Sequence, residues 1–250
     1  MKESKLDKII IDDSKKTVLI TGSSTGIGFS CLELFFEKGW NILAHYYKKT
    51  QQLTKKVKRN PLNNIITLES DFSDLNSLNN FLQIIKDYDI DALVNLAGMY
   101  DESKKTNNRI ESANIIMTVN TIAPILIAET VMENMIKNKN GAIVNISSIG
   151  VKFGSGLDNI FYGTSKIGLE AATRSLAREG ARYNVLVNAL RPGVTDTEFY
   201  SNIGKNISER VLMIPLKRAA KPIEIAKYIY FLCNDNTYIT NEVLSIAGGE

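Results

Sequence analysis

Short apolar runs and helical patterns alternate along most of this chain. The apolar runs occupy residues 17–21, 41–45, 65–68, 91–95, 142–147, 185–190 and 242–246. Patterns with apolar residues at spacings of three and four, typical of amphipathic helices, begin near residues 26, 49, 74, 110, 161 and 222. This alternation predicts an α/β fold: one doubly wound parallel sheet of about seven strands, with helices on both faces. Ligands of such sheets bind at the carboxyl ends of the strands.

The first apolar run leads directly into a glycine-rich turn, which reads Thr21-Gly22-Ser23-Ser24-Thr25-Gly26-Ile27-Gly28. Glycines permit a tight turn and let the phosphates of a ligand approach backbone N–H groups, and the helix that follows favours negative charge at its N-terminus. The spacing is GxxxGxG, which differs from the common GxGxxG dinucleotide fingerprint. We expect this turn to bind a dinucleotide pyrophosphate; a turn kept for packing alone is the simpler alternative.

A tyrosine and a lysine lie four residues apart in Tyr162-Gly163-Thr164-Ser165-Lys166, beyond Ser148. Four residues make about one helical turn, so the two side chains share a face and the ammonium can favour the phenolate. A free tyrosine titrates near pH ~10, and a nearby cation is one way to fit it for proton transfer at neutral pH. A serine hydroxyl nearby could hold a carbonyl or alcohol oxygen against the phenol. Taken alone, the pattern more often marks an amphipathic helix with a core tyrosine and a solvated lysine.

Further short motifs follow in a fixed order with the two above. They are Ser70-Asp71-Phe72-Ser73-Asp74, Asn95-Leu96-Ala97-Gly98, Val119-Asn120-Thr121, Asn145-Ile146-Ser147-Ser148 and Arg191-Pro192-Gly193. In order and spacing, the whole set resembles the short-chain dehydrogenase/reductase family over roughly residues 16–250. The resemblance implies a single Rossmann-type catalytic domain over 16–250, a charged N-terminal extension over 1–15, and a substrate lid at 194–218. The C-terminal stretch looks most like 3-oxoacyl-[acyl-carrier-protein] reductases and their sugar or polyol relatives.

The resemblance also assigns roles to individual residues. Tyr162 would donate a proton to the carbonyl oxygen, Ser148 would hydrogen-bond that oxygen, and Lys166 would lower the pKa of the tyrosine and bind the nicotinamide ribose. Asn120 would support a water-linked proton path. The expected cofactor-binding residues are Gly22, Ser24, Thr25, Gly26, Ile27, Gly28, Tyr46, Lys48, Asp71, Phe72, Asn95, Ala97, Gly98, Tyr162, Lys166, Pro192, Gly193, Val194 and Thr195.

Two departures from the family pattern affect this assignment. Leu96 stands where relatives usually carry a second asparagine, so one polar side chain beside the cofactor is missing. The separation from Ser148 to Tyr162 is one residue longer than is common, which makes Ser147 the alternative to Ser148. Because successive strand residues face opposite ways, only one of the two serines can point into the site. We favour Ser148, which ends its motif as the family's serine does.

The end of the second apolar run bears on the choice of cofactor. An NAD enzyme usually places a carboxylate there for the ribose 2′-hydroxyl, whereas a 2′-phosphate needs a neutral site with cations nearby. Here Tyr46 replaces the acid, and Lys48 and Lys49 follow. This favours NADP(H) over NAD(H), although Thr25 stands where many NADP-using relatives carry a basic residue. His45, the one histidine of the sequence, is interpreted as a half-buried strand residue.

Composition narrows the remaining possibilities. The formal net charge is +3, with 30 basic and 27 acidic residues, which gives no reason to expect a nucleic-acid partner. Cys31 and Cys233 fall in apolar helical patterns and are interpreted as small core residues, consistent with a reducing compartment. With one histidine and two dispersed cysteines we expect no metal site. The charged N-terminus lacks the apolar core of a signal peptide, and no apolar run approaches 18 residues, so we expect a cytoplasmic protein without membrane association.

Together these patterns predict an NADP(H)-dependent oxidoreductase that reduces a 3-oxoacyl thioester-like carbonyl, with acyl carrier protein as a possible partner. The alternatives are a sugar or polyol keto-reductase of surface-glycan synthesis and a non-catalytic nucleotide-binding regulator. The helix expected over 161–183 carries Gly163, Gly168, Ala171, Ala172 and Ala177, small residues that would let another helix approach or pack against their own sheet. Relatives form tetramers through the matching helix, so we expect a homotetramer, with a dimer as the alternative.

Overall fold

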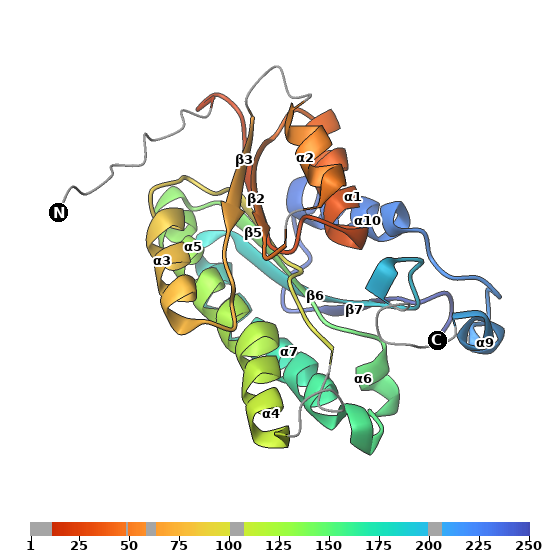
Figure 1. The fold of residues 1–250 in the computed structure, drawn as a ribbon. Coiled ribbons are helices and arrows are strands. Elements are labelled where there is room, and N and C mark those ends of the chain that lie inside the picture. The colour runs from red at the N-terminus through yellow and green to blue at the C-terminus, as the bar shows by residue number, and fades with distance from the viewer. Residues whose placement is uncertain (1–11, 49, 59–63, 101–107, 200–206) are drawn as a thin grey trace.

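The computed structural model describes residues 12–48, 50–58, 64–100, 108–199 and 207–250. Its centre is a seven-stranded parallel sheet with the strand order β3-β2-β1-β4-β5-β6-β7, which confirms the predicted fold class (Figure 1). The strands are β1 Thr17–Ile20, β2 Asn41–Tyr46, β3 Ile65–Glu69, β4 Ala92–Asn95, β5 Gly141–Ile146, β6 Val185–Pro192 and β7 Val243–Ile246. Strand order reverses beside β1, which is where doubly wound sheets bind their ligands.

Helices cover both faces of this sheet (Figure 1). The helices are α1 Gly26–Glu37, α2 Gln51–Lys58, α3 Leu75–Ile85, α4 Arg109–Met117, α5 Ala123–Asn138, α6 Gly150–Phe153, α7 Ile160–Gly180, α9 Ile207–Met213 and α10 Pro222–Asn234. Buried side chains of α1, α2 and α10 form one core with the sheet, and those of α3, α5 and α7 form the other. Short α6 and α9 lie beyond the carboxyl ends of β5 and β6.

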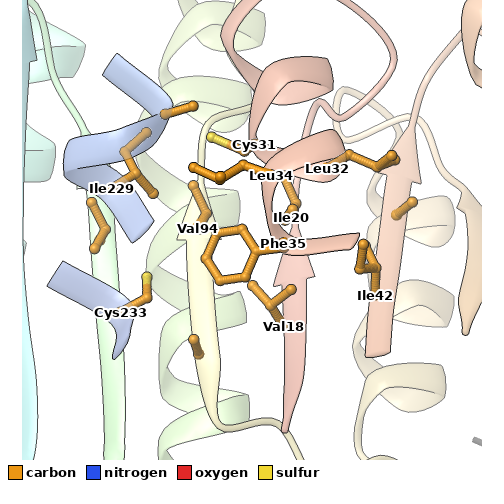
Figure 2. Packing of buried hydrophobic residues seen from close by; sticks show 14 of the residues in the cluster. Val18, Ile20, Cys31, Leu32, Leu34, Phe35, Ile42, Val94, Ile229 and Cys233 are labelled. Atoms are coloured by element: carbon orange, nitrogen blue, oxygen red, sulfur yellow. The ribbon is translucent and has the colours of Figure 1, made fainter. Parts of the chain in front are cut away.

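Strand alternation explains why there are two cores. Val18 and Ile20 of β1 face α1 and α10, whereas Leu19 between them faces the opposite layer. Figure 2 shows Phe35 of α1 lying over Val18 in the first of these cores. All four side chains are fully buried, and burying each contributes about 1.5–3 kcal/mol of hydrophobic free energy.

Cys31 and Cys233 belong to the first core, as expected, and both are free thiols. Burial raises the pKa of each thiol above its ordinary value. They behave as small apolar residues.

The run from Arg109 to Asn138 is a single helical path that the sequence predicted only at its start. Between α4 and α5 lies a π-helical segment, η1 Thr118–Ile122. The run is long and apolar enough to cross a membrane by length and composition, although polar residues interrupt it, so that no unbroken apolar run in it approaches 18 residues. However, α5 buries Ile127, Val131 and Met135 in the second core, so we interpret it as a core helix of the fold.

The small residues of α7 pack mainly within the chain. A Cβ on Gly163 would collide with the hydroxyl of Ser155, and one on Gly168 would lie 3.2 Å from Cγ2 of Thr121. Ala177 is buried in the second core. These three positions therefore pack against neighbours within the subunit and give no independent support for a partner helix, whereas Ala171 is exposed and Ala172 half-buried.

Candidate active site

The glycine turn joins β1 to α1 at the carboxyl edge of the sheet. Gly22 and Gly26 have φ values of +70° and +53°, a conformation that favours glycine. A Cβ on Gly28 would collide with the carbonyl oxygen of Gly22, so the third glycine lets the helix fold back tightly on the turn. In α1, all of which the structure describes, Thr25 makes no side-chain cap and the first turn carries no acidic residue. The turn therefore suits a phosphate group by shape and by charge.

Neighbouring strands hold this turn in place. Thr21 Oγ1 accepts hydrogen bonds from the backbone N–H groups of Leu96 and Ala97, at 2.9 and 3.0 Å. Thr50 Oγ1 donates to the carbonyl oxygen of Ser24 at 2.8 Å. A Cβ on Gly22 would lie 2.9 Å from Cα of Ala97, so the β1 and β4 turns approach each other closely only because residue 22 is glycine.

The ends of β2 and β3 differ from the sequence expectation in one respect. Tyr46 is buried, and its hydroxyl donates to Oε2 of Glu69 at 2.9 Å. Burial and this carboxylate raise the pKa of the tyrosine. Tyr47 is the exposed residue at the strand end, 54% exposed, with Nζ of Lys48 5.2 Å from its ring centroid. Lys49 lies outside the described residues.

The Glu69 carboxylate was missed because its partnership with Tyr46 depends on the β2–β3 register, which no local pattern reveals. Asp71, one turn further on, uses Oδ1 to accept from the backbone N–H and hydroxyl of Ser73, at 2.8 and 2.6 Å. Phe72 is buried and stacks on His45, with centroids 4.0 Å apart.

Tyr162 and Lys166 lie one turn apart near the start of α7, as predicted. The ammonium of Lys166 is buried, donates to the carbonyl oxygen of Ile146 at 2.9 Å, and lies 6.0 Å from the ring centroid of Tyr162. Burial lowers the pKa of Lys166 to about 8. A Cβ on Gly98 would lie 3.2 Å from both Nζ of Lys166 and Oδ1 of Asn120, so glycine after β4 leaves these groups the room to converge.

The two serines after β5 face opposite ways. Ser147 is buried, and its hydroxyl donates to Oε1 of Glu170 at 2.6 Å. Ser148 is half-buried, and its hydroxyl oxygen accepts from the backbone N–H of Gly150 at 3.2 Å. The hydroxyl of Ser147 is therefore committed to the protein interior, and that of Ser148 lies on the more open side.

Glu170 belongs to a network that sequence reasoning missed. Its carboxylate accepts two hydrogen bonds from the guanidinium of Arg191, at 2.7 and 2.6 Å, in addition to the one from Ser147. The hydrogen bonds and charge of Glu170 raise the pKa of Arg191. This network joins α7 to the ends of β5 and β6. The sequence did place the charged residue Glu170 at a buried position of the expected helix, but this pattern alone does not predict which residues bind its carboxylate.

Asn120 lies inside η1 and is fully buried. Its Oδ1 accepts from the backbone N–H of Met99, and its Nδ2 donates to the carbonyl oxygen of Met99, both at 2.8 Å. Nδ2 also donates to the hydroxyl oxygen of Ser165 at 3.1 Å. The side chain thus pins the segment after β4 to α7. Short π-helical segments frequently occur at functional sites, where they reposition one residue.

The other predicted residues of β4 and β6 have structural contacts of their own. Asn95 Nδ2 donates to Asn145 Oδ1 and to the carbonyl oxygen of Pro124, each at 2.9 Å, so its side chain faces the neighbouring strand and helix. After Pro192, the N–H of Gly193 donates to the carbonyl oxygen of Ile246 at 2.8 Å. Val194 and Thr195 follow, both buried.

An aromatic wall stands beside Tyr162. The ring of Tyr100 lies 4.9 Å from that of Tyr162 and 5.9 Å from that of Phe199, by centroids. Phe199 lies in the segment 194–218, for which the resemblance implies a substrate lid, and Tyr100 lies in the segment between β4 and α4. Residues 101–107 and 200–206 of those segments lie outside the described residues.

Comparison with known proteins identifies relatives over nearly the whole chain. A family model described as "Enoyl-(Acyl carrier protein) reductase" matches residues 22–250. The 3-oxoacyl-[acyl-carrier-protein] reductase of Chlamydia trachomatis serovar D is 32% identical over 244 residues, which cover 94% of this chain and 96% of the relative. The enzyme of the same name from Thermotoga maritima is 32% identical over 94% of this chain and 97% of its own. A solved structure described as "ElxO with NADP Bound" superposes with a TM-score of 0.80 at 29% identity, over 94% and 98% of the two chains.

Proposed function

The chain belongs to the short-chain dehydrogenase/reductase family, and from this premise we propose that it reduces the keto group of a 3-oxoacyl thioester to a hydroxyl with NADPH. It is an oxidoreductase similar in sequence to 3-oxoacyl-[acyl-carrier-protein] reductases. The observation that carries the proposal is that buried Lys166, one helical turn from Tyr162, bonds the last residue of β5, two residues before Ser148, at the strand edge that also bears the glycine turn.

NADP(H) is the cofactor, as in the NADP-bound structural neighbour. The turn from Gly22 to Gly28 fits it, because side chains on these glycines would fill the space against the backbone. When bound, NADPH supplies the hydride. We assign its 2′-phosphate to the surface at Tyr47 and Lys48. Strand β2 does not end in a carboxylate that would repel the phosphate, and the ammonium of Lys48 can pair with it.

In this proposal Tyr162 donates a proton to the carbonyl oxygen while Ser148 hydrogen-bonds the same oxygen and stabilises its developing charge. The hydrogen bond to Ile146 holds the buried ammonium of Lys166 near Tyr162. Its positive charge favours the phenolate that Tyr162 becomes after it has given up its proton. With a pKa of about 8 the ammonium keeps its proton at neutral pH. Asn120 acts through Met99 and Ser165 and is assigned a positioning role.

The thioester class is supported by the names of the curated relatives, and acyl carrier protein is the proposed carrier. Tyr100 and Phe199 offer an apolar wall next to the proposed proton donor, which suits an acyl chain. We place the enzyme in the cytoplasm and assign the catalytic domain to residues 16–250.

A homotetramer is the proposed assembly. Ile110 of α4, Ile122 of η1 and Ile160 and Ile167 of α7 are exposed on neighbouring elements that contact one another within the subunit. Two-fold pairing of such faces is common in soluble oligomers. Light scattering tests the assembly: we expect the mass of a tetramer, a dimer is the alternative stated above, and a monomer would contradict the proposal.

The test of function is NADPH oxidation by the purified enzyme with three substrates: an acetoacetyl thioester, a crotonyl thioester and a nucleotide-activated keto sugar. We expect turnover with the first. The crotonyl thioester tests the enoyl reduction named in the family description, and the keto sugar tests the alternative substrate class. Turnover only with either of these would overturn the proposed substrate.

The catalytic assignments need matched variants. Tyr162→Phe keeps the ring and should reduce kcat by about 10²–10⁴-fold, with NADPH affinity retained. Ser148→Ala should also reduce kcat severely. Ser147→Ala is the control, because this hydroxyl bonds Glu170: it should lower stability by about 1 kcal/mol and leave kcat close to wild type. The opposite result for the two serines would refute the assignment of Ser148.

A further inference from the structure

His45 lies near the carboxyl end of β2, between the glycine turn and the turn after β3. The proposed mechanism gives it no role. It is the fifth residue of β2, between β1 and β3 in the sheet. Sequence reasoning expected it to be half-buried, but its side chain is only 2% exposed, because α3 and the turn after β3 cover it. A buried imidazole is unfavourable unless its nitrogens are hydrogen-bonded, so its partners decide what it does.

Both ring nitrogens have backbone partners whose roles are fixed. The N–H of Gly22 can only donate, so Nδ1 accepts at 3.2 Å and carries no proton. The carbonyl oxygen of Ser70 can only accept, so Nε2 donates at 3.1 Å. The ring is therefore the neutral tautomer with its proton on Nε2. Burial agrees with this, since it lowers the pKa of His45 to about 4.

These partners belong to the segments that we assign to the nucleotide. Gly22 begins the glycine turn, and Ser70 directly precedes Asp71 and Phe72. The ring of Phe72 stacks on the imidazole at 4.0 Å with an angle of 5° between the planes, and Phe81 packs against it edge-on. One side chain thus connects two turns that follow different strands.

We propose that His45 is a positioning residue for the nucleotide: its ring sets the distance between the glycine turn and the turn after β3, and so preorganises the site for the adenosine half of the cofactor. This rests on the proposed function, because it takes the two turns to bind NADP(H). A phenylalanine would keep a ring that can stack on Phe72, although this ring is larger than an imidazole, and it would leave the N–H of Gly22 and the carbonyl of Ser70 without these partners.

Three substitutions separate the two contacts. His45→Asn places an acceptor near the position of Nδ1 and loses the bond to Ser70. His45→Gln places a donor near the position of Nε2 and loses the bond to Gly22. His45→Phe keeps a ring and loses both. The measurement is the dissociation constant of NADPH, and of adenosine 2′,5′-bisphosphate as a probe of the adenosine half, determined by calorimetry on folded protein.

We expect each lost hydrogen bond to weaken NADPH binding by roughly three- to tenfold, so that His45→Phe is the weakest binder. The affinity for adenosine 2′,5′-bisphosphate should fall in the same order of variants. Reduced nicotinamide mononucleotide should bind all of them with the affinity that it has for the wild type. Asn41→Leu is the matched control: Asn41 is a fully buried polar residue at the other end of β2, and its Nδ2 donates to the carbonyl oxygens of Asp12 and Lys15. It should lower stability while leaving NADPH affinity unchanged.

The outcomes distinguish the possible failures. Unchanged NADPH affinity in His45→Phe, or an equal loss in Asn41→Leu, would show that His45 is only a core residue. Wild-type protein that binds no pyridine dinucleotide would refute the proposed function and this role together. Nitrogen NMR adds an independent test, because the single histidine gives one imidazole signal set: two protonated nitrogens at neutral pH, or a proton on Nδ1, would overturn the assignment.

Discussion

The ion pair between Glu170 and Arg191 is the contact whose loss should destabilise this fold most among the described ion pairs. The Glu170 side chain is 2% exposed and that of Arg191 is 21% exposed. The carboxylate receives three short hydrogen bonds, two from Arg191 and one from Ser147. Glu170→Gln keeps the size of the side chain but removes the charge, so it leaves the guanidinium without its counterion.

The expected magnitude follows from burial. Removing one partner of a buried ion pair typically costs about 3–5 kcal/mol, because the remaining charge is uncompensated. Arg191 keeps about a fifth of its exposure, so water can solvate it in part. We therefore expect Glu170→Gln to lower the free energy of unfolding by about 2–4 kcal/mol. Glu179→Gln, on the same helix, removes an exposed partner of Arg182 and should cost at most about 0.5 kcal/mol.

Urea unfolding at one fixed protein concentration is the assay, since assembly makes apparent stability depend on concentration. The midpoint should fall while the slope stays constant. The double variant Glu170→Met/Arg191→Met removes both charges and should be more stable than Glu170→Gln alone. The reasoning is refuted if Glu170→Gln costs no more than Glu179→Gln, or if the double variant is the least stable of all.

Three shorter predictions test the residues that we assign to the nucleotide-binding site. The pKa of His45 is about 4 in the folded protein and near 6.5 in the unfolded chain, so between these pH values only the unfolded chain binds the proton. The free energy of unfolding should therefore fall by about 3 kcal/mol as pH drops from 6.5 to 4. Thermal unfolding should show that His45→Phe lacks this pH dependence. Gly28→Ala should abolish NADPH binding, because its Cβ would collide with Gly22; affinity close to wild type would refute the close approach. Lys48→Gln should weaken NADPH by roughly three- to tenfold, NADH much less, and the difference should shrink at high salt; equal losses would contradict a 2′-phosphate contact.

The sheet could be predicted from the sequence because its strands are local and buried. Val18 to Ile20 form an uninterrupted apolar run, and the glycines after it follow the strand directly, as in a turn that binds phosphate. Parallel connection then places the strand ends at one edge, so Gly22, Ser148 and Gly193 were brought together without knowledge of any contact. Predicted and observed strand bounds differ by no more than about two residues.

The contacts that organise the site could not be predicted in this way. His45 and Ser70, or Tyr46 and Glu69, meet only because β2 and β3 pair in one register. The π-helical turn at Asn120 leaves no periodic signal, since one shifted residue looks like ordinary noise in an apolar helix. Such features depend on partners distant in sequence, which single-chain patterns do not specify.

The two serines after β5 show how the two kinds of information combine. Alternation along a strand requires Ser147 and Ser148 to face opposite ways, but it does not say which of them faces the open side. Glu170 decides this, because a carboxylate buried on the inner face of α7 needs donors, and Ser147 and Arg191 supply them. The network that stabilises the fold therefore fixes the orientation of the end of β5, and it leaves the hydroxyl of Ser148 outside the network, where it accepts from the backbone N–H of Gly150. A single residue inserted between Ser147 and Ser148 would keep Ser147 on Glu170 and turn Ser148 to the same inward face, and it should abolish catalysis even if the sheet still formed.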